Sequence, residues 1–221
     1  VRSLRFFVRG PERRLFGCIS TDRWLVGVEP GATLFLCGTD IHGRDVFSRV
    51  LYGARVSLSI GVVGVAVSFV LGLLIGGISG YLGGAVDALI MRLVELVMVF
   101  PSFYLMLALR AAFPPDLSSV QVYLLIVVIL SFIGWASLAR IIRGMVLSLK
   151  EEEYIMAARA LGLSNLRIVT RHLLPNTLSY TVTALTLSVP GYILGESSLS
   201  LIGLGIQEPF PSWGNMLSAA A

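Results

Sequence analysis

The stretch SLSIGVVGVAVSFVLGLLIGGISGY, residues 57–81, decides the fold class of this chain because it contains no charged residue at all. A helix of about 20 mainly apolar residues is long enough to cross the hydrocarbon core of a bilayer. Three further apolar segments follow, at residues 88–109, 122–139 and 178–205. We therefore predict an all-α, polytopic transmembrane bundle with four spanning helices in this chain.

The overall composition excludes a soluble globular domain. Hydrophobic residues make up 56% of the chain and charged residues only 14%, whereas soluble domains carry about 25% charged residues. So few charges do not cover a water-exposed surface, and lipid is expected to face much of the protein. Most of the basic residues are arginines that flank apolar segments, which is typical of membrane proteins rather than of nucleic-acid binding.

Small residues recur at every fourth position along the first apolar segment and just beyond it: Ser68, Gly72, Gly76, Gly80 and Gly84. In lipid, such a stripe lets two helices approach closely and gain packing contacts. We predict a tight helix–helix seam along this face. Pro101 and Pro190 lie inside the second and fourth apolar segments, and each is expected to kink its helix because it removes a backbone donor.

The polarity of the chain predicts three regions: an extramembrane loop at 1–54, a transmembrane core at 55–205 and an extramembrane loop at 206–221. The orientation that the motif described below implies makes both loops external (periplasmic). Short strands are expected around residues 24–28 and 33–36 in the first loop. This loop also contains Cys18 and Cys37. Two cysteines alone leave both a disulfide and two unpaired thiols open.

The distribution of basic residues bears on the orientation in the membrane, because cytoplasmic loops carry an excess of Lys and Arg. Over the whole chain, the count of basic residues opposes an external position for residues 1–54. From Arg44 onward, seven lie on the side of the loop between the third and fourth apolar segments and four on the other side. We predict that this loop is cytoplasmic, chiefly because of the motif that it carries.

That loop reads KEEEYIMAARALGLSNLRIVTRHLLPN over residues 150–176. Good helix formers predict a first helix that stops before Gly162, a typical helix-ending residue. A second helix is expected to be capped by Ser164 or Asn165 and to end at Pro175. One side of this second helix is formed by Leu166, Val169 and Leu173.

We expect Ala157 and Ala158 to be exposed on the first helix, where they leave a shallow surface. Such a surface fits a groove on a partner protein better than it anchors in lipid. The flanking charges, Arg159, Arg167 and Arg171 against Glu151–Glu153, are suited to steering a docking partner. An amphipathic interfacial helix without a partner is the alternative that the residues alone leave open.

The arrangement Ala157-Ala158, Gly162, Ile168 and Leu174-Pro175 resembles the EAA loop of ABC importer permeases. In that family the loop is a coupling helix that docks on the ATPase subunit. Met156 stands where the family motif opens with Glu, so the role of that Glu does not carry over. By this resemblance the coupling loop spans residues 145–176, and its candidate residues are Glu153, Tyr154, Ala157, Ala158, Arg159, Gly162, Leu166, Arg167, Ile168, Leu174 and Pro175.

Further segments resemble the oligopeptide/dipeptide type of permease, and within it the second-permease, or C-type, subgroup. They are GTD at 38–40 with GRDVFSR at 43–49 and YGARVSL at 52–58, ESSLSLIGLG at 196–205, and PFPSWG at 209–214. The first of them supplies the family residues Gly38, Thr39, Asp40, Gly43, Arg44 and Asp45. With the loop, these segments follow the family's order over residues 38–216.

The family plan implies a permease bundle of the ABC importer (MetI-like) type with six spans and the EAA loop between the fourth and fifth. This chain would then hold spans two to five. We expect the first span to precede Val1 and the last to follow Ala221 in a longer protein.

The sequence contains no residue pattern typical of ATP hydrolysis, metal binding or nucleophilic catalysis. A P-loop needs Gly-x4-Gly-Lys-Ser/Thr, and the only lysine, Lys150, has no such glycine run before it. Asp40, His42 and Asp45 match no metal-binding spacing, and no Ser-His-Asp nucleophile pattern occurs. We therefore expect no enzyme activity, metal or cofactor on this chain, with ATP and Mg²⁺ on partner subunits.

Ionisable residues inside membrane spans are costly and usually functional. Arg92 and Glu95, three residues apart, are predicted to pair on one helix face. Glu196 lies deeper in its span without a local partner. Contact with a partner permease or with a solute pathway, and a position at the outer water boundary, are all open for Glu196.

The sequence thus predicts a permease subunit of an ATP-driven, binding-protein-dependent importer of peptides or similar small solutes, multi-pass in the bacterial inner membrane. Its expected partners are ABC ATPase subunits, a second permease subunit in a heterodimer, a periplasmic solute-binding protein and the lipid bilayer, and not nucleic acid. The alternative is a secondary transporter or channel subunit that couples through intramembrane carboxylates or broken helices. A purely structural membrane subunit is a third hypothesis.

Overall fold

A computed structural model describes residues 5–15, 19–27 and 35–220 of the chain. The chain divides into two units, Val1–Arg49 and Val50–Ala221, each of which is described by itself. The division lies near residue 54, where the sequence analysis placed the start of the transmembrane core. Cys18, one half of the possible disulfide, lies outside the described residues, and Cys37 is exposed.

The first unit contains a two-stranded antiparallel sheet. It is formed by β1 (Arg5–Leu15) and β2 (Ile19–Gly27). The short strand expected around residues 24–28 coincides with the end of β2, whereas β1 was not predicted. Leu36, which was expected in a strand, lies in a turn.

The family segment that begins at Gly38 folds into a tight turn. Gly38 and Gly43 both have a φ of +75°, a left-handed conformation that glycine adopts without steric cost. The carboxylate of Asp40 accepts hydrogen bonds from the main-chain N–H groups of His42 and Arg44, both at 2.9 Å, and from Arg44 Nε at 2.8 Å. Burial raises the pKa of Asp40, but these hydrogen bonds outweigh it and lower the pKa from 3.8 to about 2.

Asp45 connects this turn to the first long helix, α1 (Val46–Leu82). Its carboxylate accepts hydrogen bonds from the main-chain N–H groups of Phe47 at 3.3 Å and Ser48 at 3.2 Å. A capping aspartate in this way satisfies donors that the helix itself leaves unpaired. Within the described part of the chain, no group of three or more His, Cys, Asp or Glu side chains could hold a metal ion.

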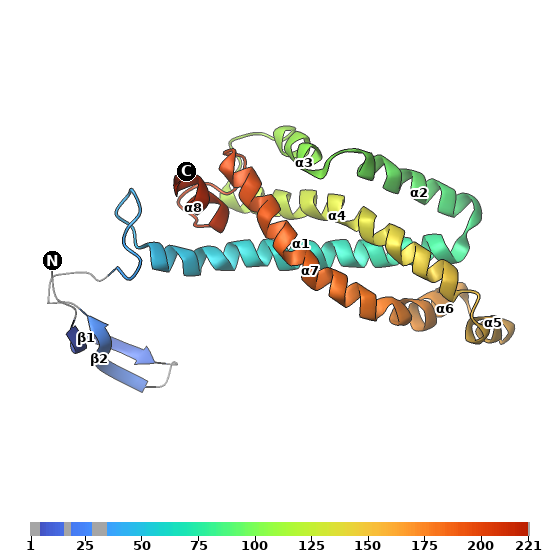
Figure 1. Ribbon diagram of the computed structural model, residues 1–221, viewed down its shortest axis with the longest axis horizontal. Coiled ribbons are helices and arrows are strands. Elements are labelled where there is room, and N and C mark those ends of the chain that lie inside the picture. The colour runs from blue at the N-terminus through green and yellow to red at the C-terminus, as the bar shows by residue number, and fades with distance from the viewer. Residues whose placement is uncertain (1–4, 16–18, 28–34, 221) are drawn as a thin grey trace. The chain divides into compact units, whose positions relative to one another are not determined.

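The second unit is helical. After α1 come α2 (Gly84–Val99), α3 (Ser102–Ala111), α4 (Ser119–Leu149), α5 (Glu153–Ala160), α6 (Asn165–Ile168), the π-helical turn η1 (Val169–Leu173), α7 (Leu174–Leu201) and α8 (Trp213–Ala220). Figure 1 shows α2 and α3 running along α4, and α7 crossing the bundle. α5 lies at one end of this unit and α8 at the opposite end, and we call these the α5 end and the α8 end.

Among the described residues, α1 and α4 are long and apolar enough to cross a membrane, and α2 with α3 make a third span if they count as one broken helix. Four spans were predicted, and the difference has two causes. Pro101 does not kink a helix but separates α2 from α3, with a bend of 88°. α7 continues through Pro190 over 28 residues, but its many Ser, Thr and Gly residues make it less apolar than α1 and α4.

The predicted small-residue seam joins α1 to α4. A methyl group at Gly76 would lie 2.5 Å from the carbonyl oxygen of Ala139, and one at Gly80 would lie 2.7 Å from that of Arg143. A methyl group at Gly72 would also clash with a side chain of α4. Glycine at these positions therefore lets the two helices approach closely.

The two ends of the predicted stripe differ. Ser68 is buried and extends the seam, because its hydroxyl donates to the carbonyl of Ser131 at 3.0 Å. Gly84 does not belong to the seam. It lies after the end of α1 with a φ of +57°, and a methyl group added there would meet no other part of the chain within 4 Å. The spacing of Gly84 matched the stripe, but α1 ends at Leu82, before this residue.

Candidate functional site at the α5 end

The loop between α4 and α7 is anchored by a buried apolar cluster. Ile155 and Ala158, three positions apart on α5, are buried together with Ile142 and Val146 of α4. The helical segments that follow α5 complete this cluster with Ile168, Val169, Leu173 and Leu174. Full burial of one such large apolar side chain stabilises a fold by about 1.5–3 kcal/mol. The loop is therefore a fixed part of the bundle.

α5 ends close to the predicted point, just before Gly162. Gly162 has a φ of +78°, its N–H donates to the carbonyl of Arg159 at 3.0 Å, and the next N–H, of Leu163, donates to the carbonyl of Ala158 at 3.2 Å. These two bonds are those of a Schellman helix end. No atom lies within 4 Å of the place where a Cβ would stand, so the backbone conformation, not space, requires glycine here.

The helix after α5 does not end at Pro175, contrary to the prediction. α6 continues through η1 into α7, of which Pro175 is the second residue. Proline has no N–H to donate to the carbonyl of Arg171, four residues earlier. In the π-helical turn the bonds span five residues instead, and the N–H of Leu174 donates to the carbonyl of Val169. The wider turn accommodates the proline, so the chain continues as a helix.

Exposed apolar side chains gather on the outside of the loop. Leu161 is 81% exposed, Leu166 71% and Met156 52%, and Tyr154 and Ala157 are also exposed. We call these five residues the loop patch. The segment also carries many charged residues and is too polar to enter the hydrocarbon core. Exposed apolar groups with a polar surround are typical of interaction sites.

The predicted coupling residues divide into exposed and buried ones. Exposed are Glu153, Tyr154, Ala157, Arg159, Gly162, Leu166, Arg167 and Pro175. Ala158, Ile168 and Leu174 are buried in the anchoring cluster. The expectation that Ala158 faces outward is wrong, because Ala158 shares the buried face of α5 with Ile155.

One further expectation is wrong at this loop, and two exposed residues were not predicted. Leu166 does not share the buried side with Val169 and Leu173, because Ile168 sets the buried face there. Met156 and Leu161 were not among the predicted coupling residues, although both are apolar and lie outside the buried positions of α5. That combination of apolar type and exposed position is the signal that identifies them.

Tyr81, near the end of α1, also holds the loop. Its hydroxyl donates to Asn165 Oδ1 at 3.0 Å, and the guanidinium of Arg159 lies 5.4 Å from the centroid of its ring. Tyr81 is itself buried in the anchoring cluster. Arg159 was predicted to steer a partner, but the structure gives it a cation–π contact within the chain. Sequence reasoning missed Tyr81 because Asn165 is 84 positions away.

Ionisable side chains connect the helices near this end. Arg143 Nε of α4 donates to Asp87 Oδ1 of α2 at 2.7 Å, and the hydroxyl of Ser79 of α1 donates to the same oxygen at 2.6 Å. This contact joins three helices and was not predicted. The predicted pair of Arg92 and Glu95 forms at 3.1 Å on an exposed face of α2.

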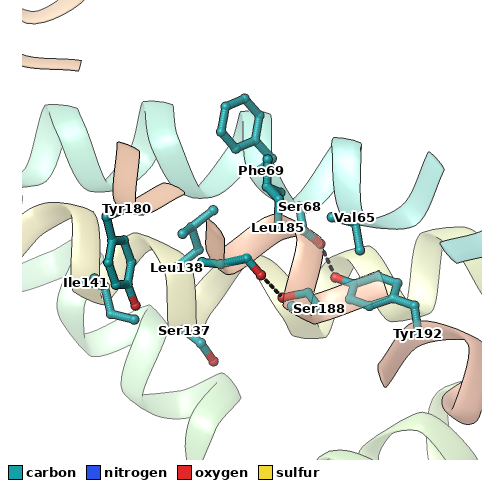
Figure 2. A pocket seen from close by; sticks show the side chains of 12 residues that line it. Val65, Ser68, Phe69, Ser137, Leu138, Ile141, Tyr180, Leu185, Ser188 and Tyr192 are labelled. Carbon is teal, nitrogen blue, oxygen red and sulfur yellow. Dashed lines mark hydrogen bonds between the residues drawn. The ribbon is translucent and has the colours of Figure 1, made fainter. Parts of the chain in front are cut away.

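A cavity of about 340 Å³ lies between α1, α4 and α7 (Figure 2). Hydroxyl groups line it, from Ser68, Ser137, Tyr180, Ser188 and Tyr192. The hydroxyls of Tyr192 and Ser68 share a hydrogen bond, and Ser188 donates to the carbonyl of Ala184 in its own helix. The cavity thus combines these five hydroxyl groups with apolar side chains such as Val65, Phe69 and Leu138.

Long apolar helices and a structured polar loop define an integral membrane protein. The chain belongs to the family described as binding-protein-dependent transport system inner membrane component, which matches residues 72–221. It is 43% identical over 179 residues to the dipeptide transport system permease protein DppC of Bacillus subtilis, covering 81% of this chain and 54% of the relative. It is 46% identical over 184 residues to the oligopeptide transport system permease protein OppC of Escherichia coli K12, covering 83% and 59%.

Among solved structures, the chain is similar to a subunit of the MetNI methionine ABC transporter in an inward-facing conformation. The TM-score is 0.58 at 20% identity, and the match covers 75% of this chain and 76% of the other. This similarity establishes the fold and confirms the predicted MetI-like bundle. The predicted resemblance to oligopeptide/dipeptide ABC permeases is confirmed by the family and the relatives. The chain spans less than two thirds of the length of those two relatives.

Proposed function

We propose that this chain is the transmembrane permease subunit of an ATP-driven, binding-protein-dependent importer of peptides or similar small solutes. Its family and the names of its relatives support this proposal. The chain would lie in the bacterial inner membrane as a multi-pass protein, with the α5 end in the cytoplasm. A second permease subunit and a periplasmic solute-binding protein would complete the transport system.

The loop patch is the observation that carries the proposal. Large exposed apolar side chains beside charged ones have the composition of a protein interface. The patch stands on a buried cluster that α1, α4 and α7 share, so a displacement of the patch is passed to all three helices. ABC ATPase subunits would dock on the patch, and their ATP state would share a coupling free energy with the position of the loop.

ATP and Mg²⁺ would bind to those partner subunits. The only lysine of the chain, Lys150, is not preceded by the glycine pattern of a P-loop. The chain itself would catalyse no reaction and hold no cofactor. Its contribution would be to change the exposure of a solute path in response to its partners.

The exposed side of α7 is the surface on which we place the solute path. Thr183 and Thr186, three positions apart, are exposed there, and each hydroxyl donates to the carbonyl four residues earlier. A helix face with these hydroxyls is less apolar than the faces of α1 and α4, the two helices that are apolar enough to cross a membrane. This side of α7 would face the second permease subunit, and the hydroxyl-lined cavity of Figure 2 lies against the same helix.

Co-purification tests the docking proposal. The full-length, detergent-solubilised protein is isolated from its native membranes, and the accompanying chains are identified by mass spectrometry. We expect P-loop ATPase subunits and a second permease with the wild-type protein, and loss of the ATPase subunits with Leu161→Glu. Ile41→Glu is the matched control, because Ile41 is equally exposed at 80% but lies outside the loop.

Two results would contradict the proposal. ATPase subunits retained at the wild-type ratio by Leu161→Glu would refute docking on the patch. A wild-type protein that purifies stably without any ATPase would instead favour a secondary transporter, and dependence of uptake on ion gradients rather than ATP would then be measured.

A further inference from the structure

Glu196 of α7 is the centre of a buried polar cluster at the α8 end. It is fully buried, and its carboxylate accepts hydrogen bonds from the hydroxyls of Ser200 at 2.8 Å, Ser212 at 2.9 Å and Ser57 at 3.3 Å. The three serines are also buried and come from α7, the segment before α8, and α1. No basic side chain in the described part of the chain pairs with this carboxylate. Glu196 is therefore enclosed by its own chain and is not exposed to water.

The same serines hold the segment before α8. The hydroxyl of Ser57 accepts a hydrogen bond from the main-chain N–H of Trp213 at 3.0 Å, and that of Ser212 accepts one from Asn215 at 3.1 Å. The indole N–H of Trp213 donates to the carbonyl of Val50 at 3.1 Å. The start of α8 is thus bonded to α1 directly and to α7 through Glu196.

Backbones also approach closely at this end. A methyl group at Gly214 would lie 2.7 Å from the Cα of Ser197, and one at Gly205 would lie 2.5 Å from the Cα of Ser200. The segment YGARVSL therefore meets the segments ESSLSLIGLG and PFPSWG at one place, although Ser57 and Glu196 are 139 positions apart in the sequence. Their serines and glycines supply the hydrogen bonds and the room that this contact needs.

We propose that Glu196, Ser57, Ser200 and Ser212 form a permanent clasp, which keeps the α8 ends of α1 and α7 together with α8 as one body while the α5 end responds to its partners. Opening the clasp would leave a buried carboxylate without its donors, and such a group is strongly destabilised in a low-dielectric environment. The glycine contacts leave no room for the backbones to slide past one another. The clasp itself rests on these contacts, and its permanence while the α5 end responds to partners rests on the proposed function.

Thiol labelling of a buried neighbour measures the clasp directly. Ser197 is buried under Gly214, and its hydroxyl is not a donor to the carboxylate. In full-length protein in which Cys18, Cys37 and any other native cysteine are replaced by serine, we expect a maleimide to react with the Ser197→Cys variant at least about tenfold more slowly than with Gln207→Cys, because a closed clasp must open before reaction. Gln207 is the control because it is exposed in the same region.

Substitution of Glu196 then shows whether the clasp, and not burial alone, slows the labelling of Ser197→Cys. Adding Glu196→Ala is expected to raise the labelling rate of Ser197→Cys by about tenfold or more, since the loss of the carboxylate frees the segment before α8. Glu196→Gln should raise it less, because the amide oxygen still accepts hydrogen bonds. If Glu196→Ala does not fold, Ser57→Ala replaces it, and a smaller increase is expected because one donor is lost.

Three outcomes would overturn the inference. One is equal labelling of Ser197→Cys and Gln207→Cys, and another is a rate that neither Glu196→Ala nor Ser57→Ala changes. The third outcome tests whether the clasp stays closed, and it is measured in the transport complex isolated with its native partners. Labelling of Ser197→Cys in that complex should be equally slow with and without ATP, and faster labelling in either state would show that the clasp opens.

Discussion

The two ends of the helical unit are built differently. At the α8 end, a carboxylate is buried under three serine hydroxyls, and backbones touch at glycines. At the α5 end, one set of apolar side chains anchors the loop while another set stays exposed. Hydrogen bonds in a low dielectric fix one arrangement, whereas apolar contact is non-directional and accepts a new partner. From this difference we expect the α8 end to hold the helices together and the α5 end to bind a partner.

The seam between α1 and α4 connects the two ends, so breaking it has the largest expected effect. Gly76→Ala places a methyl group 2.5 Å from the carbonyl oxygen of Ala139. We expect a loss of about 1–3 kcal/mol of stability from this overpacking, seen as a lower Tm of the purified protein in detergent.

Gly144→Ala is the matched control for this substitution. Gly144 lies in α4, and no atom lies within 4 Å of the place where its methyl group would stand. Alanine is also favoured over glycine in a helix by about 1 kcal/mol. The Tm of Gly144→Ala should therefore be unchanged or raised. Equal effects of the two alanine substitutions would show that the seam is not tight.

A second substitution acts at the α5 end alone. Gly162→Val forces a β-branched residue into a left-handed conformation, which costs an L-residue about 1–2 kcal/mol, and should displace the turn that carries Leu161. We expect normal membrane insertion but loss of most solute-stimulated ATPase activity in the assembled complex. Gly162→Asn should retain more activity, because asparagine tolerates this conformation. Normal stimulation in Gly162→Val would contradict a coupling role for the loop.

The hydrogen bond between Tyr81 of α1 and Asn165 of the loop predicts a smaller effect on stability. Tyr81→Phe removes the hydrogen bond to Asn165 and should lower stability by about 1 kcal/mol, measured as Tm in detergent. Asn165→Ala should cost a similar amount, and the double variant should cost little more than either one, because both remove the same bond. Fully additive losses would mean that the bond contributes nothing. Tyr81→Leu should cost more, since the contact with Arg159 is lost as well.

The smallest expected effect is the loss of the Asp40 turn at low pH in the first unit. The structure at the α5 end and at the α8 end should not change with it. The pKa of Asp40 is lowered from 3.8 to about 2, so its stabilising contribution is fully present above pH 3.8 and is lost as the pH falls through about 2. Hydrogen exchange of the turn that contains Asp40 should show this loss, and Asp40→Asn should remove the pH dependence. A wild-type turn that already loses its protection well above pH 4 would contradict the assignment.

The sequence predicted well those features that depend on neighbours in the chain. Apolar runs predicted the long helices, the four-residue spacing predicted most of the seam, and Gly162 predicted a helix end. The same local patterns were wrong where three-dimensional geometry intervened. Pro175 did not end a helix, because a π-helical turn supplies bonds that do not need its N–H. Gly84 matched the stripe but lies beyond the end of α1.

Contacts between distant residues were not predictable from a single sequence. The bonded pairs Tyr81 with Asn165, Asp87 with Arg143, and Ser57 with Glu196 are separated by 84, 56 and 139 positions. No local spacing marks such pairs, because their partners are brought together only by helix packing. Glu196 was identified as an unusual residue from its place in an apolar segment, but its role became visible only with its three serines.

Cross-linking from single cysteines tests most directly whether the α5 end is the docking site. A photoreactive cross-linker is attached to Leu161→Cys, and in a separate sample to Gln207→Cys near α8. Both variants are made in full-length protein in which Cys18, Cys37 and any other native cysteine are replaced by serine, and which is isolated with its native partners. Both positions are exposed. We expect cross-links from Leu161→Cys to a P-loop ATPase subunit and none from Gln207→Cys. The absence of an ATPase cross-link at Leu161→Cys, or equal cross-linking at both positions, would contradict the assignment of binding to the α5 end.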